Sequence, residues 1–169
     1  MLQVDTISEG KFIDSEKPVR IEYHQLSFSY QDILAKFGNE EFNAVNFATT
    51  IDGKIMLVNA LIGKTDLKQT KAFIEKLDKK YGKSTKTKGE FSDKKYDIFT
   101  WQLKDRIMRY TTVLDNEENV LKIEIDEENK KIRNGGKNPH YKGYLFIIKK
   151  QYKNQIFGKI SSGDFVFFE

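Results

Sequence analysis

Apolar and polar residues alternate in short runs along most of the chain, and this alternation constrains the fold more than any other feature of the sequence. In residues 17–25, for example, Val19, Ile21 and Tyr23 alternate with polar side chains that include His24. Successive side chains of a β-strand point to opposite faces, so a period of two predicts a half-buried strand. The pattern places His24 on the exposed side of that strand.

Two longer stretches predict β-hairpins. Residues 43–62 hold two β-prone runs around the Asp-Gly dipeptide at 52–53, which readily adopts the positive φ angles of a tight turn. Residues 96–114 hold a second pair of runs with a turn near the Lys-Asp pair at 104–105. Further strands are expected over residues 120–126 and 143–152, and a final hairpin over residues 155–168.

Two segments show the spacing of helices. Residues 29–38 begin with Ser29 and Asp32 in the arrangement of a capping box and end at Gly38, which suits a left-handed stop. Residues 65–82 place apolar side chains on one face and charged side chains on the other. We therefore expect two amphipathic helices, the second followed by a polar, Lys-rich connector over residues 83–95.

The two hairpins are similar in sequence. Residues 47–56 and 99–108 share a first Phe, a basic residue after the turn and a final Ile-Met pair, and each hairpin follows an expected helix that ends in an aromatic residue and glycine. The sequence thus predicts a degenerate tandem helix-hairpin repeat, residues 29–61 and 66–114, followed by C-terminal strands over residues 119–168. Chance similarity between amphipathic hairpins is the alternative.

These elements together predict an α+β fold. Strands joined by tight turns favour antiparallel pairing, so we expect roughly nine or ten antiparallel strands with the two helices packed on one face. The chain of 169 residues, 38% of them apolar, is long enough for one domain over residues 1–169. Only about the first dozen residues are expected to be weakly held.

The chain contains no cysteine, which excludes disulfide bonds, thiol catalysis and cysteine-ligated metals. Its start lacks the basic and apolar regions of a signal peptide, and it holds no apolar run of about 18 residues. We therefore expect a soluble cytoplasmic protein that does not insert into a membrane. An exported form whose leader had been removed would look the same.

Charge is unevenly distributed in the second half of the chain. Residues 130–159 hold nine lysine or arginine residues and no acid, whereas residues 114–128 hold seven acids and one lysine, a net charge of −6. Such segregation can create a surface field that steers an oppositely charged partner. It can equally reflect two neighbouring strands that neutralise each other, and the sequence does not decide between the two.

The stretch LIGKTD, residues 61–66, contains the Gly-Lys-Thr of a phosphate-binding loop. Such a loop needs an earlier glycine five residues before the second one, and Val58 stands at that position. We therefore expect no nucleotide site here. Gly63 is expected to make a turn, and Thr65 or Asp66 to cap the helix that follows.

No other motif predicts catalysis or metal binding. The two histidines are far apart in the sequence, and the acidic residues of 114–131 lack the order of a calcium loop. Ser161 and Ser162 lie outside a G-x-S-x-G motif. The sequence therefore predicts no enzyme, no metal site and no cofactor.

Residues 133–144 form the one long stretch that contains Gly, Asn and Pro, with His140 beside Tyr141 and Tyr144. Loops held by a rigid sheet often carry function, so this loop is the best single location for a contact, although a plain connector is the alternative. The basic tract that continues from it interleaves lysines with aromatics, as nucleic-acid-binding surfaces do. It has little arginine and no RNP1-like run.

The sequence favours a non-enzymatic protein-binding module of the inhibitor or toxin-immunity type. The alternatives are a small-molecule or lipid-binding domain of the cell envelope and a nucleic-acid-binding protein. The expected partner is another protein, with an acidic surface if the basic tract is the binding surface. The residues expected to contact it are Arg133, Lys137, His140, Tyr141, Tyr144, Lys149, Lys150, Tyr152, Lys153 and Trp101.

Overall fold

The computed structural model describes residues 1–9, 16–38, 40–116, 119–125, 130–160 and 162–169. For residues 119–125 and 130–134 it describes the backbone alone. Within the described part of the chain, no helix is long and apolar enough to cross a membrane.

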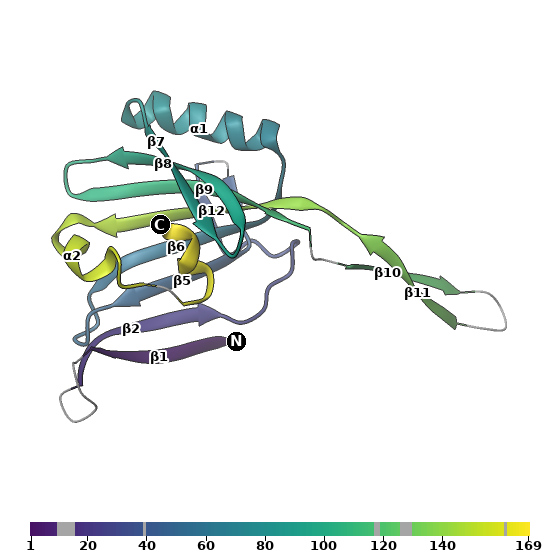
Figure 1. Cartoon of the computed structure of the whole chain (residues 1–169), viewed down its shortest axis with the longest axis horizontal. Coiled ribbons are helices and arrows are strands. Elements are labelled where there is room, and N and C mark those ends of the chain that lie inside the picture. The colour runs from purple at the N-terminus through teal and green to yellow at the C-terminus, as the bar shows by residue number, and fades with distance from the viewer. Residues whose placement is uncertain (10–15, 39, 117–118, 126–129, 161) are drawn as a thin grey trace.

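Eight strands form one antiparallel sheet, which is the body of the molecule (Figure 1). In their order across the sheet they are β1 (Leu2–Glu9), β2 (Lys17–Gln25), β5 (Ala44–Thr49), β6 (Ile55–Thr65), β12 (His140–Lys149), β9 (Arg106–Asp115), β8 (Lys94–Gln102) and β7 (Thr85–Phe91). β1 and β7 are the edge strands. β12 pairs with β6 on one side and with β9 on the other, so a late strand joins the two predicted hairpins.

Four further strands form two small hairpins. β3 (Ala35–Phe37) pairs with β4 (Glu40–Phe42), and β10 (Asn119–Ile125) pairs with β11 (Lys130–Lys137). The β10–β11 hairpin projects from the sheet as an arm (Figure 1). The described residues thus form twelve strands, where the sequence predicts roughly nine or ten.

Pairing within the arm bears on the uneven charge of this half of the chain. The register sets Glu124 of β10 opposite Lys131 of β11. In the main sheet, the Asp115 carboxylate of β9 lies 2.6 Å from the Lys142 ammonium of β12. The Asp115–Lys142 pair favours the interpretation that the acidic segment and the basic tract neutralise each other as neighbouring strands.

The long helix α1 (Leu67–Tyr81) forms where the sequence predicts it. It begins with a capping box, in which the Asp66 carboxylate accepts from the Gln69 backbone N–H and the Gln69 side chain accepts from the Asp66 N–H. Phe73 and Leu77, four residues apart on one face, are buried. The other helical elements are short: η2 (Lys150–Tyr152), α2 (Lys153–Ile156) and η3 (Gly163–Phe168).

α1 and the C-terminal segment cover opposite faces of the sheet. The C-terminal segment comprises the described residues after β12, 150–160 and 162–169. Phe73 of α1 packs in a cluster with Leu145 of β12, whereas Phe165 and Phe168 of η3 pack in a cluster with Phe146, the next residue of the same strand. Neighbouring residues of a strand face opposite sides. The sheet is therefore covered by helical elements on both faces, whereas of the two helices expected on one face only α1 forms.

Residues 29–38 do not form the expected helix. The Ser29 and Asp32 contacts close a single turn, in which the Asp32 N–H donates to the Ser29 carbonyl at 3.0 Å, but the chain then enters β3. A helix of this length is marginal in water, and pairing with β4 competes with it. Gly38, with φ of +65°, serves the β3–β4 turn instead of a helix stop.

Three other expectations are also corrected. Of the first dozen residues, expected to be weakly held, Leu2–Glu9 form β1 and pair with β2, and residues 10–12 lie outside the described residues. Residues 83–95 form β7 and a turn at Ser92 and Asp93, both with positive φ, instead of a connector. The expected hairpin over residues 155–168 does not form: its described residues include the end of α2 and all of η3, in which Phe165 and Phe168 recur at helical spacing and are fully buried.

Both predicted hairpins form, as β5–β6 and β8–β9. They flank β12 on its two sides, and their matching residues Phe47 and Phe99 lie on the face that α1 packs against. Both hairpins of the predicted tandem repeat are therefore present, whereas the helix of its first copy is absent from the described structure, and the repeat itself stays a prediction.

Candidate functional site: a polar cleft beside an edge strand

A polar cleft opens where β2 separates from β5. The two strands pair only along Ile21–Tyr23, and beyond this point the Gln25 backbone N–H donates to the Asn46 side-chain oxygen at 2.7 Å. The separation leaves a cavity of about 280 Å³. The cavity is lined by Gln3, Asp5, His24, Gln25, Leu26, Asn46, Ser162, Gly163 and Asp164.

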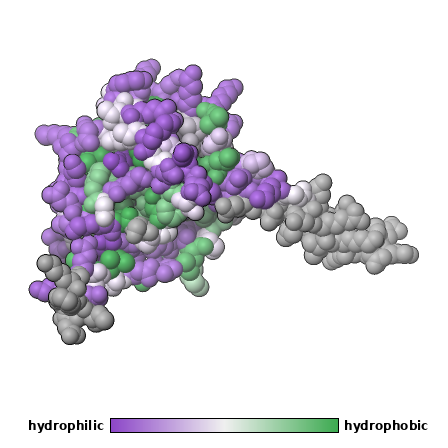
Figure 2. Space-filling view, viewed as in Figure 1, coloured by the Kyte–Doolittle hydropathy of each residue, from purple (hydrophilic) through white to green (hydrophobic). Residues whose placement is uncertain are grey.

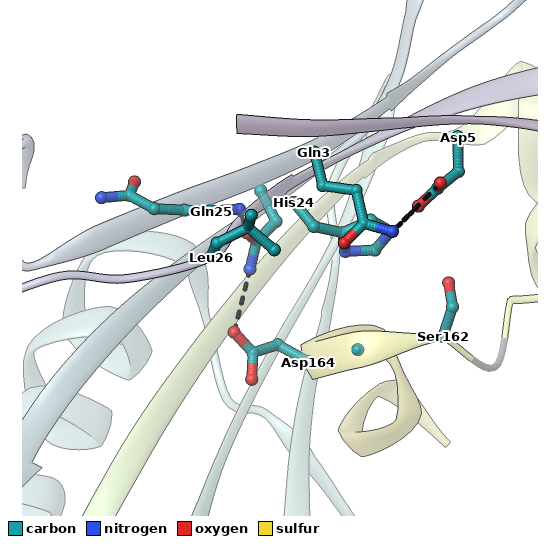
Figure 3. Close-up of a pocket in the computed structure, with 9 residues that line it drawn as sticks. Gln3, Asp5, His24, Gln25, Leu26, Ser162 and Asp164 are labelled. Carbon is teal, nitrogen blue, oxygen red and sulfur yellow. Dashed lines mark hydrogen bonds between the residues drawn. The ribbon is translucent and has the colours of Figure 1, made fainter. Parts of the chain in front are cut away.

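Four parts of the chain supply the walls of this cleft. Gln3 and Asp5 come from β1, His24 comes from β2, Asn46 comes from β5, and Ser162 and Asp164 lie at the start of η3. Figure 3 shows the β1 side chains on one side of the cleft, Ser162 and Asp164 on the other, and His24 between them. The Gln3 amide donates to the Asp5 carboxylate at 2.9 Å, which holds both side chains at the mouth.

A buried carboxylate, Glu22, lies beneath the cleft. It is fully removed from solvent and accepts hydrogen bonds from the Arg20 guanidinium, at 2.6 Å between Nε and Oε1, and from the Ser162 hydroxyl. His24 Nε2 lies 3.3 Å from the second carboxylate oxygen. A buried charge is costly unless it is paired and hydrogen-bonded, and these contacts meet that requirement.

Arg20 fastens the C-terminal segment to the β1–β2 edge. Its Nη2 donates to the Lys159 carbonyl at 2.6 Å, and its Nη1 donates to the Glu9 carboxylate at 3.3 Å. The Lys159 ammonium lies 3.0 Å from the same carboxylate. The segment that forms one wall of the cleft is therefore held by Arg20 at one end and by the Ser162–Glu22 contact at the other.

Gly163 lets the C-terminal segment approach β2 closely. It has φ of +50°, and a Cβ at this position would lie 3.0 Å from His24 Nδ1. The His24 ring also packs edge-on against Phe165, with ring centroids 5.0 Å apart. His24 is therefore half-buried under the C-terminal segment, and the expectation that it lies exposed on the strand is wrong.

Asp164 is the second acidic group of the cleft. Burial raises the pKa of its carboxyl above the ordinary value, while a hydrogen bond from Asn46 and the nearby charges of Lys142 and His24 oppose that rise. The Asn46 amide donates to both Asp164 and the Asn59 side chain at 3.0 Å. Asp164 is thus a desolvated acid that faces Asp5 across the cleft.

The arrangement does not support nucleophilic catalysis. In a Ser-His-acid triad the imidazole stands between the hydroxyl and the carboxylate, so that it can remove the hydroxyl proton. Here Glu22 stands between Ser162 and His24, and it accepts the Ser162 hydroxyl proton as a hydrogen bond. Among the described residues, no three His, Asp or Glu side chains form a group that could hold a metal ion. The carboxylates and amides that line the cleft can accept hydrogen bonds from a group such as an ammonium or guanidinium.

The opposite face of the same strands carries an apolar surface. Tyr23 and Phe47 stack with ring centroids 4.4 Å apart, and Val4 pairs with Tyr23, which places Leu2 and Val4 on this face. Leu2 is 50% and Val4 is 56% exposed. We call Leu2, Val4, Tyr23 and Phe47 the open apolar face.

α1 does not reach the open apolar face. The cluster beneath the helix draws its sheet residues from β6, β12, β9 and β8, and none from β1 or β2. The other side of the molecule, seen with the C-terminal segment in front, is hydrophilic around its rim, with hydrophobic surface in its middle and near the N-terminal end of β1 (Figure 2). Within the described part of the chain, one half of a sheet face is therefore left without a covering layer.

The two edge strands differ in how they are protected. Lysine and proline on an edge strand discourage pairing with another chain. β7 carries Lys86 and Lys88, whose ammonium groups lie 2.7 and 2.5 Å from the Asp97 carboxylate. β1 contains no lysine, arginine or proline, and its charged residues are Asp5 and Glu9. β1 is thus the less protected edge.

Four of the residues predicted to bind a partner are buried. Trp101, Tyr144 and Tyr152 belong to the two core clusters, and the Trp101 indole donates to Asp78 at 3.0 Å. His140 is 6% exposed and packs edge-on against Tyr30. These four side chains are not available as surface anchors, because the three aromatic residues pack in the core and His140 packs against Tyr30.

The remaining predicted residues lie apart from the cleft. Lys149, Lys150 and Lys153 are exposed where β12 ends, at the opposite end of that strand from exposed Lys137. The Arg133 side chain lies outside the described residues. The predicted set is therefore spread over the molecule and does not form one surface.

Half-buried Tyr141 lines a second cavity, between α1 and the β8–β9 strands. This groove has a volume of about 460 Å³. Leu67, Ile74 and Phe99 supply apolar side chains to it, and Lys71, Glu75 and Asp78 supply charged ones. It is the larger of the two cavities and the less polar.

Gly63 lies within β6 and does not make a turn. The rings of Phe28 and Tyr30 occupy the space where a side chain would project, and its N–H donates to the Asn43 side chain at 2.8 Å. The stretch LIGKTD is therefore a strand end followed by a capped helix, with no loop that could surround a phosphate.

Sequence reasoning missed the residues of the cleft. Arg20, Glu22 and His24 look like the solvent side of a strand, and they become buried because Lys159, Ser162 and Phe165 pack over them. The signal that could have identified them is the aromatic run at the end of the chain, which needs a sheet face to cover.

The chain was also compared with known proteins. No protein-family model, curated protein or solved structure matches it.

Proposed function

We propose that the chain is a non-enzymatic protein-recognition module, of the kind that serves as an inhibitor or a toxin-immunity protein, and that it binds its partner around β1. The observation that carries the proposal is the open apolar face. Removing apolar surface from water is favourable by roughly 25 cal/mol per Å². A partner that covers Leu2, Val4, Tyr23 and Phe47 would therefore be bound more tightly.

The surroundings of this face have the composition of a recognition surface. An apolar centre rimmed by polar groups is typical of protein interfaces, and the cleft residues Gln3 and Asp5 supply such a rim from the same strand. The exposed lysines 149, 150 and 153 lie elsewhere, so an acidic partner surface is no longer the expectation for this site. The acidic cleft favours a basic one.

The test compares variants of equal chemistry at different places. Leu2→Glu/Val4→Glu puts two negative charges on the open apolar face, and Ile51→Glu puts one negative charge on the β5–β6 turn, where Ile51 is 48% exposed. Tagged wild type and variants are incubated with nuclease-treated lysate of the source cells, and retained proteins are quantified by mass spectrometry. A candidate is then purified and titrated by calorimetry.

A partner that binds wild type and Ile51→Glu alike, and Leu2→Glu/Val4→Glu at least about tenfold more weakly, supports the proposal. A purified partner that binds all three proteins equally contradicts the location of the site. Retention that depends on nucleic acid before nuclease treatment contradicts the proposed class.

The groove beside α1 favours small-molecule binding as a second candidate function. Its size falls within the range of small-molecule pockets, and Leu67, Ile74 and Phe99 give it an apolar lining. A medium-chain fatty acid should then raise the melting temperature of wild type and not that of Leu67→Glu. Equal shifts in both proteins would contradict this candidate.

A further inference from the structure

We propose that β1 recruits an extended segment of the partner as a ninth strand of the sheet, and that this segment places a lysine or arginine over Asp5 at the mouth of the cleft. This inference rests on the proposed function and specifies the chemistry of the partner. It depends on the backbone of β1, the charges beside it and the two faces that it separates.

The outer backbone groups of β1 follow from its register. The Leu26 N–H donates to the Met1 carbonyl at 3.2 Å, and the next residues pair Leu2 with Gln25 and Gln3 with His24. Hydrogen-bonded and non-hydrogen-bonded pairs alternate along an antiparallel ladder. The backbone N–H and C=O groups of Leu2, Val4 and Thr6 therefore point away from β2.

No described strand pairs with this outer side of β1. Three residues with outward N–H and C=O groups offer a template for a short added strand, which is how extended peptides are recognised at sheet edges. Val4 is the central residue of this template.

The two acids of β1 are in different situations. The Glu9 carboxylate contacts the Arg20 guanidinium and the Lys159 ammonium, at 3.3 and 3.0 Å. Asp5 accepts hydrogen bonds from the Gln3 amide, and among the described contacts it has no ion pair. The Asp5 carboxylate at the open edge can therefore form an ion pair with a basic side chain of the added strand.

Charge also decides which occupant the edge prefers. Two β1 strands from two copies of the chain would bring Asp5 of each copy close to the acids of the other, and like charges across a strand pair are destabilising. A segment with a basic residue opposite Asp5 instead forms a favourable cross-strand pair. We therefore assign the edge to a basic segment of a different protein.

The alternation of β1 sets the pattern of the added strand. Leu2, Val4 and Thr6 face the apolar side, and Gln3 and Asp5 face the cleft. The added strand should alternate in the same way, with Val, Thr or another β-former extending the open apolar face and with Lys or Arg beside the cleft.

The probe is a pair of synthetic nonapeptides, blocked at both ends, that alternate Val or Thr with either Lys or Glu. Each is titrated into ¹⁵N-labelled protein, and the amide shifts and the affinity are measured. The Lys peptide should shift the amides of Leu2, Val4 and Thr6 and should bind about fivefold or more tightly than the Glu peptide. Asp5→Lys should reverse that preference.

Two variants at Val4 separate the backbone from the side chain. Val4→Pro removes an N–H that points away from β2, so no hydrogen bond to β2 is lost. An edge strand tolerates proline at such a position. Val4→Ala keeps the N–H and loses most of the side chain. The Lys peptide should bind Val4→Ala within about threefold of wild type and Val4→Pro at least about tenfold more weakly, with both variants folded by circular dichroism.

Equal binding of the Lys and Glu peptides, shifts that map away from β1, or a wild-type dimer in sedimentation that Val4→Pro dissolves would overturn the inference. These results leave the proposed function standing if the lysate partner still requires Leu2 and Val4. If the lysate partner binds without Leu2 and Val4, the proposed function is contradicted, regardless of how the two peptides bind.

Discussion

Arg20 and Glu22, two residues apart on β2, form an ion pair with Nε and Oε1 2.6 Å apart, and both are almost completely removed from solvent. Residues i and i+2 share one face of a strand, so the pair projects together beneath the C-terminal segment. The Lys159 carbonyl and the Ser162 hydroxyl complete its hydrogen bonds. The pair therefore links the edge of the sheet to the wall of the cleft.

Glu22→Ala should lower the free energy of unfolding by about 3 to 5 kcal/mol, because it leaves the Arg20 guanidinium buried with only the partly exposed Glu9 carboxylate beside it. Urea unfolding followed by circular dichroism measures the change. Glu9→Ala, whose side chain is 39% exposed, is the matched control and should cost less than about 1 kcal/mol. Equal costs for the two variants would show that the buried pair does not hold the segment.

Asp164→Asn should stabilise the protein at pH 7, on the order of 1 kcal/mol, because the amide oxygen can still accept from Asn46 without burying a charge. Burial raises the pKa of the Asp164 carboxyl in the folded state, so the folded state binds its proton more tightly than the unfolded state. The contribution of the neutral acid is fully present below the unfolded value near 3.8 and is lost as pH rises through the folded pKa.

The unfolding free energy of wild type minus that of Asp164→Asn should therefore become more negative as pH rises from 4 to 7, because the unfolded pKa lies near 3.8 and the folded pKa lies above it. Asp5→Asn, on the other wall of the cleft, controls for the loss of one negative charge. A difference that stays constant with pH, or rises, would show that Asp164 is not a desolvated acid in solution.

The parts of the fold that local pattern decides could be predicted from the sequence. The Asp-Gly turn and its flanking alternation specify β5–β6, and the apolar stripe with its cap specifies α1, because each depends on residues close in the chain. Residues 29–38 have similar local signals. Their outcome depends on pairing with β4 and on aromatic packing over β6, which local pattern does not reveal.

The candidate site could not be predicted, because it depends on contacts between the two ends of the chain. Ser162 contacts Glu22, and Arg20 contacts Lys159, across nearly the whole sequence. Period two assigns Glu22 to one face of β2 correctly, but it cannot say which of the two faces will be covered. The C-terminal segment covers the polar face and leaves the apolar one open.

Gly63→Ala should lower the free energy of unfolding by about 1 to 3 kcal/mol, because a new methyl group would overlap the rings of Phe28 and Tyr30. Gly63 has no positive φ, so the cost comes from packing alone. Thermal unfolding of Gly63→Ala, Tyr30→Ala and the double variant forms a double-mutant cycle. Part of the loss should be recovered in the double variant, and strictly additive effects would contradict the contact.

Asp78 provides the last prediction, because it fastens the end of α1 to the sheet. Its carboxylate accepts from the Trp101 indole at 3.0 Å, the Ser84 backbone at 2.9 Å and the Lys83 ammonium at 2.8 Å. Burial alone would raise the pKa of Asp78, but the hydrogen bonds from Lys83 and Ser84 lower it to about 2. The ionised carboxylate therefore stabilises the folded state above the unfolded value of 3.8, and this contribution is lost as pH falls toward 2.

Asp78→Asn should abolish that pH dependence and lower the free energy of unfolding at pH 7 by about 1 to 2 kcal/mol, a range reduced for the solvent exposure of Lys83. Lys83→Met removes only the exposed ion pair and should cost less than about 1 kcal/mol, because the Trp101 and Ser84 contacts remain. Urea unfolding at pH 3 and pH 7 measures both variants. If Lys83→Met costs as much as Asp78→Asn, the surface ion pair and not the buried contacts holds the helix end.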